Sequence, residues 1–106
     1  MLYKPITAYD VSKFNPTVGI VTPVYKEMPK IFKKALESWE TNKPDELIAV
    51  LDVTDDACIR IFRKFSKNKP WTKMIITDKP GKREALVTGI KECKSQIVAL
   101  VDSDTI

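Results

Sequence analysis

Apolar residues in three segments of the chain recur at helical spacing. In each segment they occupy positions i, i+1, i+4, i+5 and i+8, which forms one apolar stripe along an otherwise polar helix. The three stripes are Ile31, Phe32, Ala35, Leu36 and Trp39; Ala57, Cys58, Ile61, Phe62 and Phe65; and Ala85, Leu86, Gly89, Ile90 and Cys93. Helix-start residues agree, with Pro29 in a first turn, Thr54 or Asp55 as a cap, and Gly81 before the third stripe. The pattern predicts helices near residues 29–41, 55–68 and 82–94.

Between these helices lie short and almost continuous apolar runs, at residues 18–21, 47–51, 74–76 and 97–101. Runs without alternation suit strands that are buried on both faces, as in a parallel sheet with helices on each side. Parallel neighbours need crossover helices, and the elements alternate strand, helix, strand. We therefore predict an α/β fold, a doubly wound and mostly parallel Rossmann-like sheet with strand order 3-2-1-4.

The 106 residues fit one small domain or part of a larger one. Residues 1–16 contain two prolines and no clear period, so we expect an irregular N-terminal arm before an α/β unit at residues 17–106. The chain stops directly after its fourth predicted strand, which suggests the front half of a larger domain. We expect the surface left by the missing half to favour self-association.

Composition narrows the possible chemistry. The chain has no histidine, which excludes Ser-His-Asp and Cys-His catalysis and histidine general bases. Cys58 and Cys93 lack partners at metal-ligand spacing, so we expect free thiols in a reducing, cytoplasmic compartment. Any chemistry must then come from carboxylates, Lys, Arg, Tyr or a metal.

Charge and hydropathy narrow the possible partners. The net charge of +4 favours anionic partners, but the lysines do not interleave with aromatic residues, so we expect no nucleic acid. No apolar run approaches the roughly 20 residues of a membrane span, and the N-terminus lacks the apolar core of a signal peptide. We predict a cytoplasmic segment with no membrane span, and we leave open the membrane association of a longer parent protein.

The pair Asp102 and Asp104 is the sharpest chemical signal. Two carboxylates one residue apart at a strand end can bind one divalent cation, and oxygen ligands suit Mg²⁺ or Mn²⁺ bridging to phosphate oxygens. A solvated acidic turn is the alternative. The apolar run 97–101 leads straight into the pair and favours the metal site.

Other polar residues fall at the same edge of the predicted sheet, where open α/β sheets bind ligands. Asp52 ends the second strand, where it can accept a hydrogen bond from a ligand. Lys82 and Arg83 begin the third helix, where cations oppose the helix dipole, and this placement indicates an anionic ligand. Tyr25 either stacks on a base or packs as a loop aromatic, and the sequence leaves both readings open.

The motifs VGIVTPVYKE, PGKREAL and VALVDSDT, with a strand ending at Asp52, together resemble the N-terminal half of a family 2 glycosyltransferase of the GT-A fold. The likeness covers about residues 17–106, and within the family the chain is similar to hyaluronan, chitin and cellulose synthases. It implies these donor and metal contacts: Pro23, Val24, Tyr25 and Glu27 around the nucleoside, Asp52 on the base, Lys82 and Arg83 on the base or diphosphate side, and Asp102 and Asp104 as the DxD motif that meets the ribose and the metal. Val53 stands where the family usually has glycine.

Two functions follow. The resemblance implies the donor-binding part of an inverting glycosyltransferase, with a nucleotide sugar, most simply a UDP-sugar, and Mg²⁺ or Mn²⁺. The family's catalytic base, acceptor site and QxxRW-type motif lie beyond the DxD, so we assign no catalytic residue and expect no sugar transfer by this chain alone. The alternative is a free-standing, non-catalytic α/β module that binds nucleotides or a protein partner.

Overall fold

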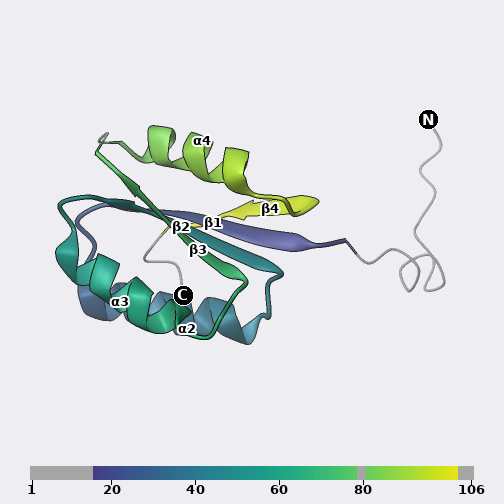
Figure 1. The fold of residues 1–106 in the computed structure, drawn as a ribbon, viewed down its shortest axis with the longest axis horizontal. Coiled ribbons are helices and arrows are strands. Elements are labelled where there is room, and N and C mark those ends of the chain that lie inside the picture. The colour runs from purple at the N-terminus through teal and green to yellow at the C-terminus, as the bar shows by residue number, and fades with distance from the viewer. Residues whose placement is uncertain (1–15, 79–80, 103–106) are drawn as a thin grey trace.

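Four parallel strands form one sheet in the order β3-β2-β1-β4, in a computed structural model that describes residues 16–78 and 81–102 (Figure 1). The strands are β1 (Val18–Val24), β2 (Glu46–Asp52), β3 (Thr72–Thr77) and β4 (Ile97–Leu100), and the helices are α2 (Pro29–Thr41), α3 (Asp56–Ser66) and α4 (Lys82–Glu92). The predicted α/β fold and strand order are confirmed. The predicted arm at residues 1–16 lies, except for its last residue, outside the described residues.

Helices cover both faces of the sheet. Helices α2 and α3 pack side by side on one face, and α4 lies across β1 and β2 on the other (Figure 1). Successive residues of β1 point to opposite faces, so Val24 joins the cluster under α2 and α3 while Val21 joins the cluster under α4. Both central strands are therefore buried on both sides, which explains their continuous apolar runs.

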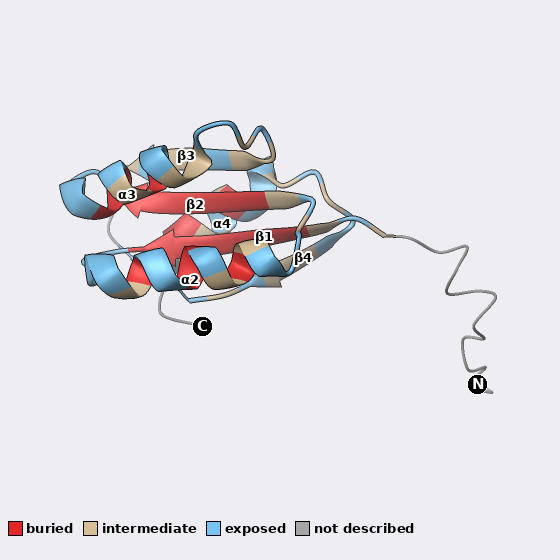
Figure 2. Cartoon of the chain, turned by 90° about the horizontal axis from the view of Figure 1, so that it is seen from below, coloured by how far each residue is buried: buried red, intermediate tan, exposed pale blue. Residues whose placement is uncertain are grey.

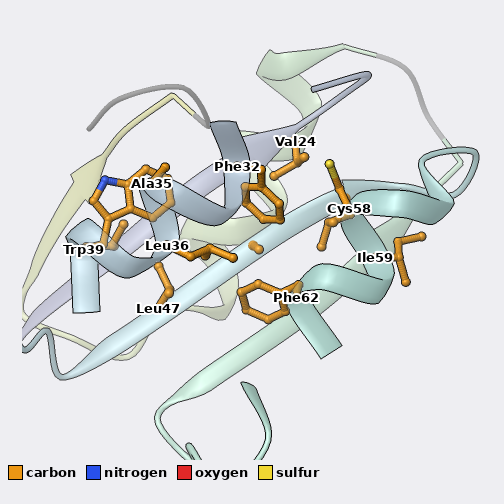
Figure 3. Close-up of a cluster of buried hydrophobic side chains, with 12 residues drawn as sticks. Val24, Phe32, Ala35, Leu36, Trp39, Leu47, Cys58, Ile59 and Phe62 are labelled. Carbon is orange, nitrogen blue, oxygen red and sulfur yellow. The ribbon is translucent and has the colours of Figure 1, made fainter. Parts of the chain in front are cut away.

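The larger cluster lies between the sheet and the pair α2 and α3 (Figure 3). Phe32 of α2 and Phe62 of α3 stack with ring centroids 6.4 Å apart, and Leu36 and Leu47 are fully buried beside them. Trp39 closes the far end of the cluster. These contacts fix the angle between the two helices. None of the helices in the described ranges has the length and apolar content needed to cross a bilayer.

The helices begin at or directly after the helix-start residues that the sequence predicted. Pro29 occupies the first turn of α2, as predicted. Asp55 caps α3, because its Oδ1 accepts a hydrogen bond from the Cys58 N–H at 3.4 Å, and Gly81 precedes α4. The ends of α3 and α4 come two residues earlier than predicted, at Ser66 and Glu92.

Two positions of the predicted apolar stripes are wrong. In α3, Ala57 is exposed and Ile59 is buried in its place. In α4, Ile90 is 42% exposed, because Ala85 and Gly89 are the residues that face the sheet. These two small residues, one helical turn apart, let α4 approach β1 closely and leave Ile90 on its flank.

Pro23 stands inside β1 without breaking the sheet. Val21 O accepts the Val101 N–H at 3.1 Å, so Pro23, two residues further on, also directs its nitrogen to the β4 side. The β1–β4 pairing ends at the pair Val21 and Leu100. The missing N–H of proline therefore costs no hydrogen bond of the ladder.

Candidate functional site at the carboxyl edge of the sheet

A small pocket lies at the carboxyl ends of β1, β2 and β3. Its volume of about 10 Å³ holds about one water molecule. Its lining residues are Pro23, Val24, Tyr25, Val50, Asp52, Thr77, Gly81 and Ala85. The fold thus brings together four of the residues predicted around the nucleoside, Pro23, Val24, Tyr25 and Asp52. Tyr25 lines the pocket and is also 42% exposed to solvent.

A larger cavity of about 520 Å³ lies elsewhere, under the C-terminal end of α2 along β1 and β4. Its walls include Ile20, Trp39 and Ala99, and it contains none of the predicted site residues. By volume alone, this cavity would be the candidate binding site. The polar residues selected from the sequence, however, lie at the carboxyl edge, where open α/β sheets bind their ligands.

Asp52 is buried at the end of β2, and its carboxylate is held by Thr54. The Thr54 hydroxyl and the Thr54 N–H, the latter at 3.0 Å, both donate to Asp52 Oδ2. These two bonds hold the pKa of Asp52 below its ordinary value against the opposing effect of burial, and the charge of Lys26 adds to them. Asp52 is therefore ionised at neutral pH, and an ionised carboxylate acts only as a hydrogen-bond acceptor.

Val53 follows Asp52 where the resemblance led us to expect glycine. The turn is closed by the Asp55 N–H, which donates to Asp52 O at 3.0 Å, while the Val53 N–H donates to Thr77 O at 2.9 Å. The described non-glycine residues with positive φ are Lys26, Lys43 and Asn68, so Val53 keeps an ordinary backbone conformation. The turn does not require glycine, and Val53 leaves the position of Asp52 intact.

In the loop after β1, Tyr25 lines the pocket and Glu27 does not. Tyr25 lines the pocket, with Lys26 Nζ 5.3 Å from the centroid of its ring. Glu27 does not line the pocket, and its Oε1 accepts the Met28 N–H at 2.9 Å before α2 begins. Lys26 adopts a left-handed conformation with φ of 52°. The structure therefore supports Tyr25 at the pocket but gives Glu27 a role in the loop.

Cys58 fastens this loop to α3. Its thiol donates to Glu27 O at 3.5 Å. Burial first, and then the carboxylates of Asp55 and Glu27, raise the pKa of the Cys58 thiol to about 12. The thiol is protonated at neutral pH and is not a nucleophile. Cys58 and Cys93 are both free, as predicted.

Lys82, Arg83 and Asp102 lie at the same edge of the sheet. Arg83 is exposed in the first turn of α4, and Lys82 is the first residue of that helix. Asp102 is exposed just after β4, and Asp104 lies outside the described residues. Within the described ranges, no three His, Cys, Asp or Glu side chains gather as metal ligands. The divalent-metal site therefore stays a prediction.

Strand register places Asp52 and Asp102 on opposite sides of the end of β1. Leu51 pairs with Val24, and Leu100 pairs with Val21, so Asp52 at the end of β2 and Asp102 after β4 flank β1 with an offset of two residues along the strands. Neighbouring strands are about 4.8 Å apart and a strand rises about 3.3 Å per residue, which puts the two backbones about 12 Å apart. The edge between them offers a carboxylate at each end.

Sequence reasoning missed several residues of this site. Thr54 holds the carboxylate of Asp52, and Thr77 lines the pocket from the end of β3. The strand-end rule that selected Asp52 applies equally to Thr77, because the two residues are register partners. Gly81, with φ of 114°, contributes a conformation that other residues rarely adopt. No signal in the sequence identified the Thr54 contact, which depends on the shape of the turn.

A parallel sheet whose strand order reverses beside β1, with polar groups at that edge, is the architecture of nucleotide-binding α/β domains. The model of the family described as Glycosyl transferase family 2 matches residues 19–106, and the chain belongs to this family. The predicted resemblance to family 2 glycosyltransferases is confirmed at the level of the family.

Curated relatives agree with this assignment. The chain is 26% identical over 93 residues to an undecaprenyl-phosphate 4-deoxy-4-formamido-L-arabinose transferase from Pseudomonas fluorescens (strain Pf0-1), a match that covers 82% of this chain and 27% of that protein. It is 26% identical over 96 residues to an N-acetylglucosaminyltransferase from Bradyrhizobium diazoefficiens, covering 86% of this chain and 20% of the relative. An N-acetylglucosaminyltransferase from Rhizobium sp. (strain N33) is 27% identical over 95 residues, covering 85% and 21%. The chain thus spans about a quarter of these relatives or less.

Proposed function

We propose that this chain binds the nucleotide-sugar donor of an inverting family 2 glycosyltransferase, and that the donor is a UDP-sugar. The observation that carries the proposal is the ionised, buried Asp52 beside Pro23 and Tyr25 in the pocket at the carboxyl edge. A carboxylate accepts the imide N–H of a uracil base, and an exposed tyrosine ring offers a stacking surface. The base would enter by displacing Tyr25, which lines the pocket.

The diphosphate and its metal belong, in this proposal, at the β4 side of the edge. Asp102 and Asp104 would form the DxD motif and bind Mg²⁺ or Mn²⁺, for which carboxylate oxygens are suitable ligands. The exposed position of Asp102 across β1 from Asp52 supports this arrangement. Lys82 and Arg83 at the start of α4 would add positive charge on the diphosphate side. The bound ion would supply charge neutralisation to the departing nucleoside diphosphate.

The names of the relatives guide the choice of sugar. Two of the relatives are N-acetylglucosaminyltransferases, so UDP-N-acetylglucosamine is the donor that we propose to test first. A parent protein of the hyaluronan, chitin or cellulose synthase type is part of the same proposal.

Calorimetric titration of UDP, with and without Mn²⁺, tests the donor site. We expect Mn²⁺ to strengthen binding to the wild type, and Asp104→Asn to abolish that increment at a cost of about 1 to 3 kcal/mol. Asp52→Asn should weaken UDP with or without the ion, because its carboxylate contacts the base and not the metal. Lys82→Ala should do the same through the diphosphate.

The matched control is Asp56→Asn, which removes an exposed carboxylate at the start of α3 and lies outside the pocket lining. It should bind UDP like the wild type. If UDP affinity is equal in the wild type, Asp52→Asn and Asp104→Asn, and is unaffected by Mn²⁺, the donor-site proposal is wrong.

A further inference from the structure

Helices α2 and α3 carry a concentrated positive charge on their outer surface, the face that Figure 2 shows from outside. Seven exposed cations lie on the two helices and at the end of α3: Lys30, Lys33, Lys34, Arg60, Arg63, Lys64 and Lys67. The exposed carboxylates of these helices are Glu37 and Asp56. Glu40 is half-buried and pairs with Lys69 at 3.4 Å. We call this surface the basic face. Its seven exposed cations and two exposed carboxylates give it a net charge of +5, against +4 for the whole chain.

A groove with an apolar floor runs between the two helices on this basic face. Its volume is about 330 Å³, and its apolar lining residues are Leu36, Ile61 and Phe65. Its charged lining residues are three lysines and two glutamates: Lys33, Lys64, Lys69, Glu37 and Glu40. Lys69 lies along the groove, with Nζ 4.5 Å from the centroid of the Phe65 ring and donating to Phe65 O at 2.8 Å. Hydrocarbon and ammonium groups are thus accessible together, as a partner with both anionic and apolar parts requires.

We propose that the basic face binds the anionic surface of a lipid bilayer. Two helices packed side by side offer a broad layer of cations to a plane of headgroups, and each Lys or Arg near such a surface favours binding by about fivefold. The groove would receive apolar groups of the lipids at the bilayer surface. Nothing in this surface overlaps the donor pocket, so the inference goes beyond the proposed function.

The aromatic residues of the two helices argue against a nucleic-acid partner. Proteins that bind single strands combine cations with exposed rings on which bases stack. On α2 and α3, Phe32, Trp39 and Phe62 are buried and Phe65 is half-buried in the groove. The basic face therefore lacks the stacking surface that a nucleic acid would need.

The opposite face provides a matched control. Lys91 and Lys94 are exposed three residues apart at the end of α4, as Lys64 and Lys67 are on the basic face. They stand beside Glu92, which pairs with Lys73 at 3.2 Å. At 0.1 M salt the screening length is about 10 Å, which is about the thickness of one layer of the fold. Charges on α4 should therefore contribute little to binding through α2 and α3.

Cosedimentation with large vesicles tests the proposal. We expect the chain to partition onto phosphatidylcholine vesicles that contain 30% phosphatidylglycerol, and not onto vesicles of phosphatidylcholine alone, in 0.1 M salt. Lys64→Glu with Lys67→Glu should lower the partition coefficient by at least about twentyfold. The control pair Lys91→Glu with Lys94→Glu, which changes the net charge equally, should lower it less than about threefold. Circular dichroism checks that both variants keep the fold.

Each of these outcomes would overturn the proposal: equal binding to neutral and anionic vesicles, equal losses in the two charge-reversed pairs, or full competition by inorganic phosphate at the concentration of accessible lipid phosphate. A single-stranded oligonucleotide that binds more tightly than the vesicles, through Lys64 and Lys67, would overturn it in favour of a nucleic-acid partner. UDP titration of the same variants tests the donor site separately from the vesicle assay. If the donor-site proposal fails, the vesicle result is unchanged.

Discussion

Thr54 holds Asp52 with two hydrogen bonds, from its hydroxyl and from its own N–H, both to Oδ2. The two residues are separated by one position in the turn after β2. This contact holds the carboxylate in place at the pocket and lowers its pKa. Thr54, two positions after Asp52, therefore positions the carboxylate at the pocket.

Replacing Thr54 with valine should raise the pKa of Asp52 toward its ordinary value of 3.8, because the hydroxyl bond is the largest cause of the lowered pKa. NMR titration of the Asp52 carboxyl carbon measures the change. Thr41→Val is the control, since the Thr41 hydroxyl donates to the backbone oxygen of Glu37. An Asp52 titration that is unchanged in Thr54→Val would contradict the prediction.

The same pair gives stability a defined pH dependence. A folded-state pKa below 3.8 stabilises the fold above that pH, and the contribution is lost as the pH falls through the lowered pKa. Thr54→Val should therefore be less stable than the wild type at pH 7, and the difference should shrink below pH 3.8. Urea unfolding at several pH values measures it. In an Asp52→Asn background the pH-dependent part of the difference should disappear.

Glu46 should anchor the start of β4. Its Oε1 accepts hydrogen bonds from Ser95 Oγ at 2.6 Å, Lys94 N at 2.9 Å and Cys93 Sγ at 3.5 Å. Burial would raise the pKa of Glu46, but these bonds outweigh it and lower the pKa. Glu46→Ala removes the common acceptor, and we expect about 1 kcal/mol of local stability to be lost after allowance for solvent screening.

Hydrogen exchange at the β4 amides should therefore rise about fivefold in Glu46→Ala, against little change in β2 and β3. The lowered pKa makes the effect present above pH 4.5 and lost as the pH falls through the folded-state pKa. Glu92→Ala, which removes a carboxylate from the surface of α4, is the control. Equal exchange in both variants would show that Glu46 does not anchor β4.

Gly89→Ala should destabilise the fold although alanine favours helices. A Cβ at position 89 would lie 2.3 Å from Val21 Cγ1 and 3.3 Å from Val50 Cγ2, so α4 would have to move away from the sheet. Overpacking costs about 1 to 3 kcal/mol, against a gain in helix propensity of about 1 kcal/mol. We expect a net loss of up to about 2 kcal/mol in the free energy of unfolding.

Urea denaturation measures this loss, with Lys91→Ala on the exposed side of α4 as the control. Adding Val21→Ala makes room for the new methyl group. The double variant should therefore lose less than the sum of the two single losses. Gly89→Ala as stable as the wild type would mean that α4 does not pack this closely.

The β4 side of the sheet should mediate self-association. Ile97 and Leu100 of this edge strand are 45% and 50% exposed, beside the 520 Å³ cavity that Ala99 and Val101 help to line. Exposed apolar edges of this kind pair with other chains. Sedimentation at high concentration should show a dimer or larger assembly, and Leu100→Lys should shift it to monomer. A wild type that stays monomeric would exclude this interface.

Much of the fold could be predicted from local patterns. Helix α2 has the predicted bounds, and the parallel order 3-2-1-4 followed from uninterrupted apolar runs joined by helices. The pocket residues Tyr25 and Asp52 were selected because parallel strands bring their carboxyl ends to one edge, and Pro23 was selected through the family resemblance. Glu27, which the resemblance placed beside the nucleoside, accepts the Met28 N–H in the loop, and its contact with a nucleoside stays a prediction.

The sequence by itself determined the elements, their parallel arrangement and the edge that carries the polar residues, because side-chain periodicity and strand ends are local properties. Tertiary structure decided how each element is rotated against its neighbours. Gly89 faces Val21 and leaves Ile90 in solvent, and Ile59 replaces Ala57 in the core. The physical reason is that a stripe on one helix spans a range of directions, and close packing against residues distant in sequence selects one of them.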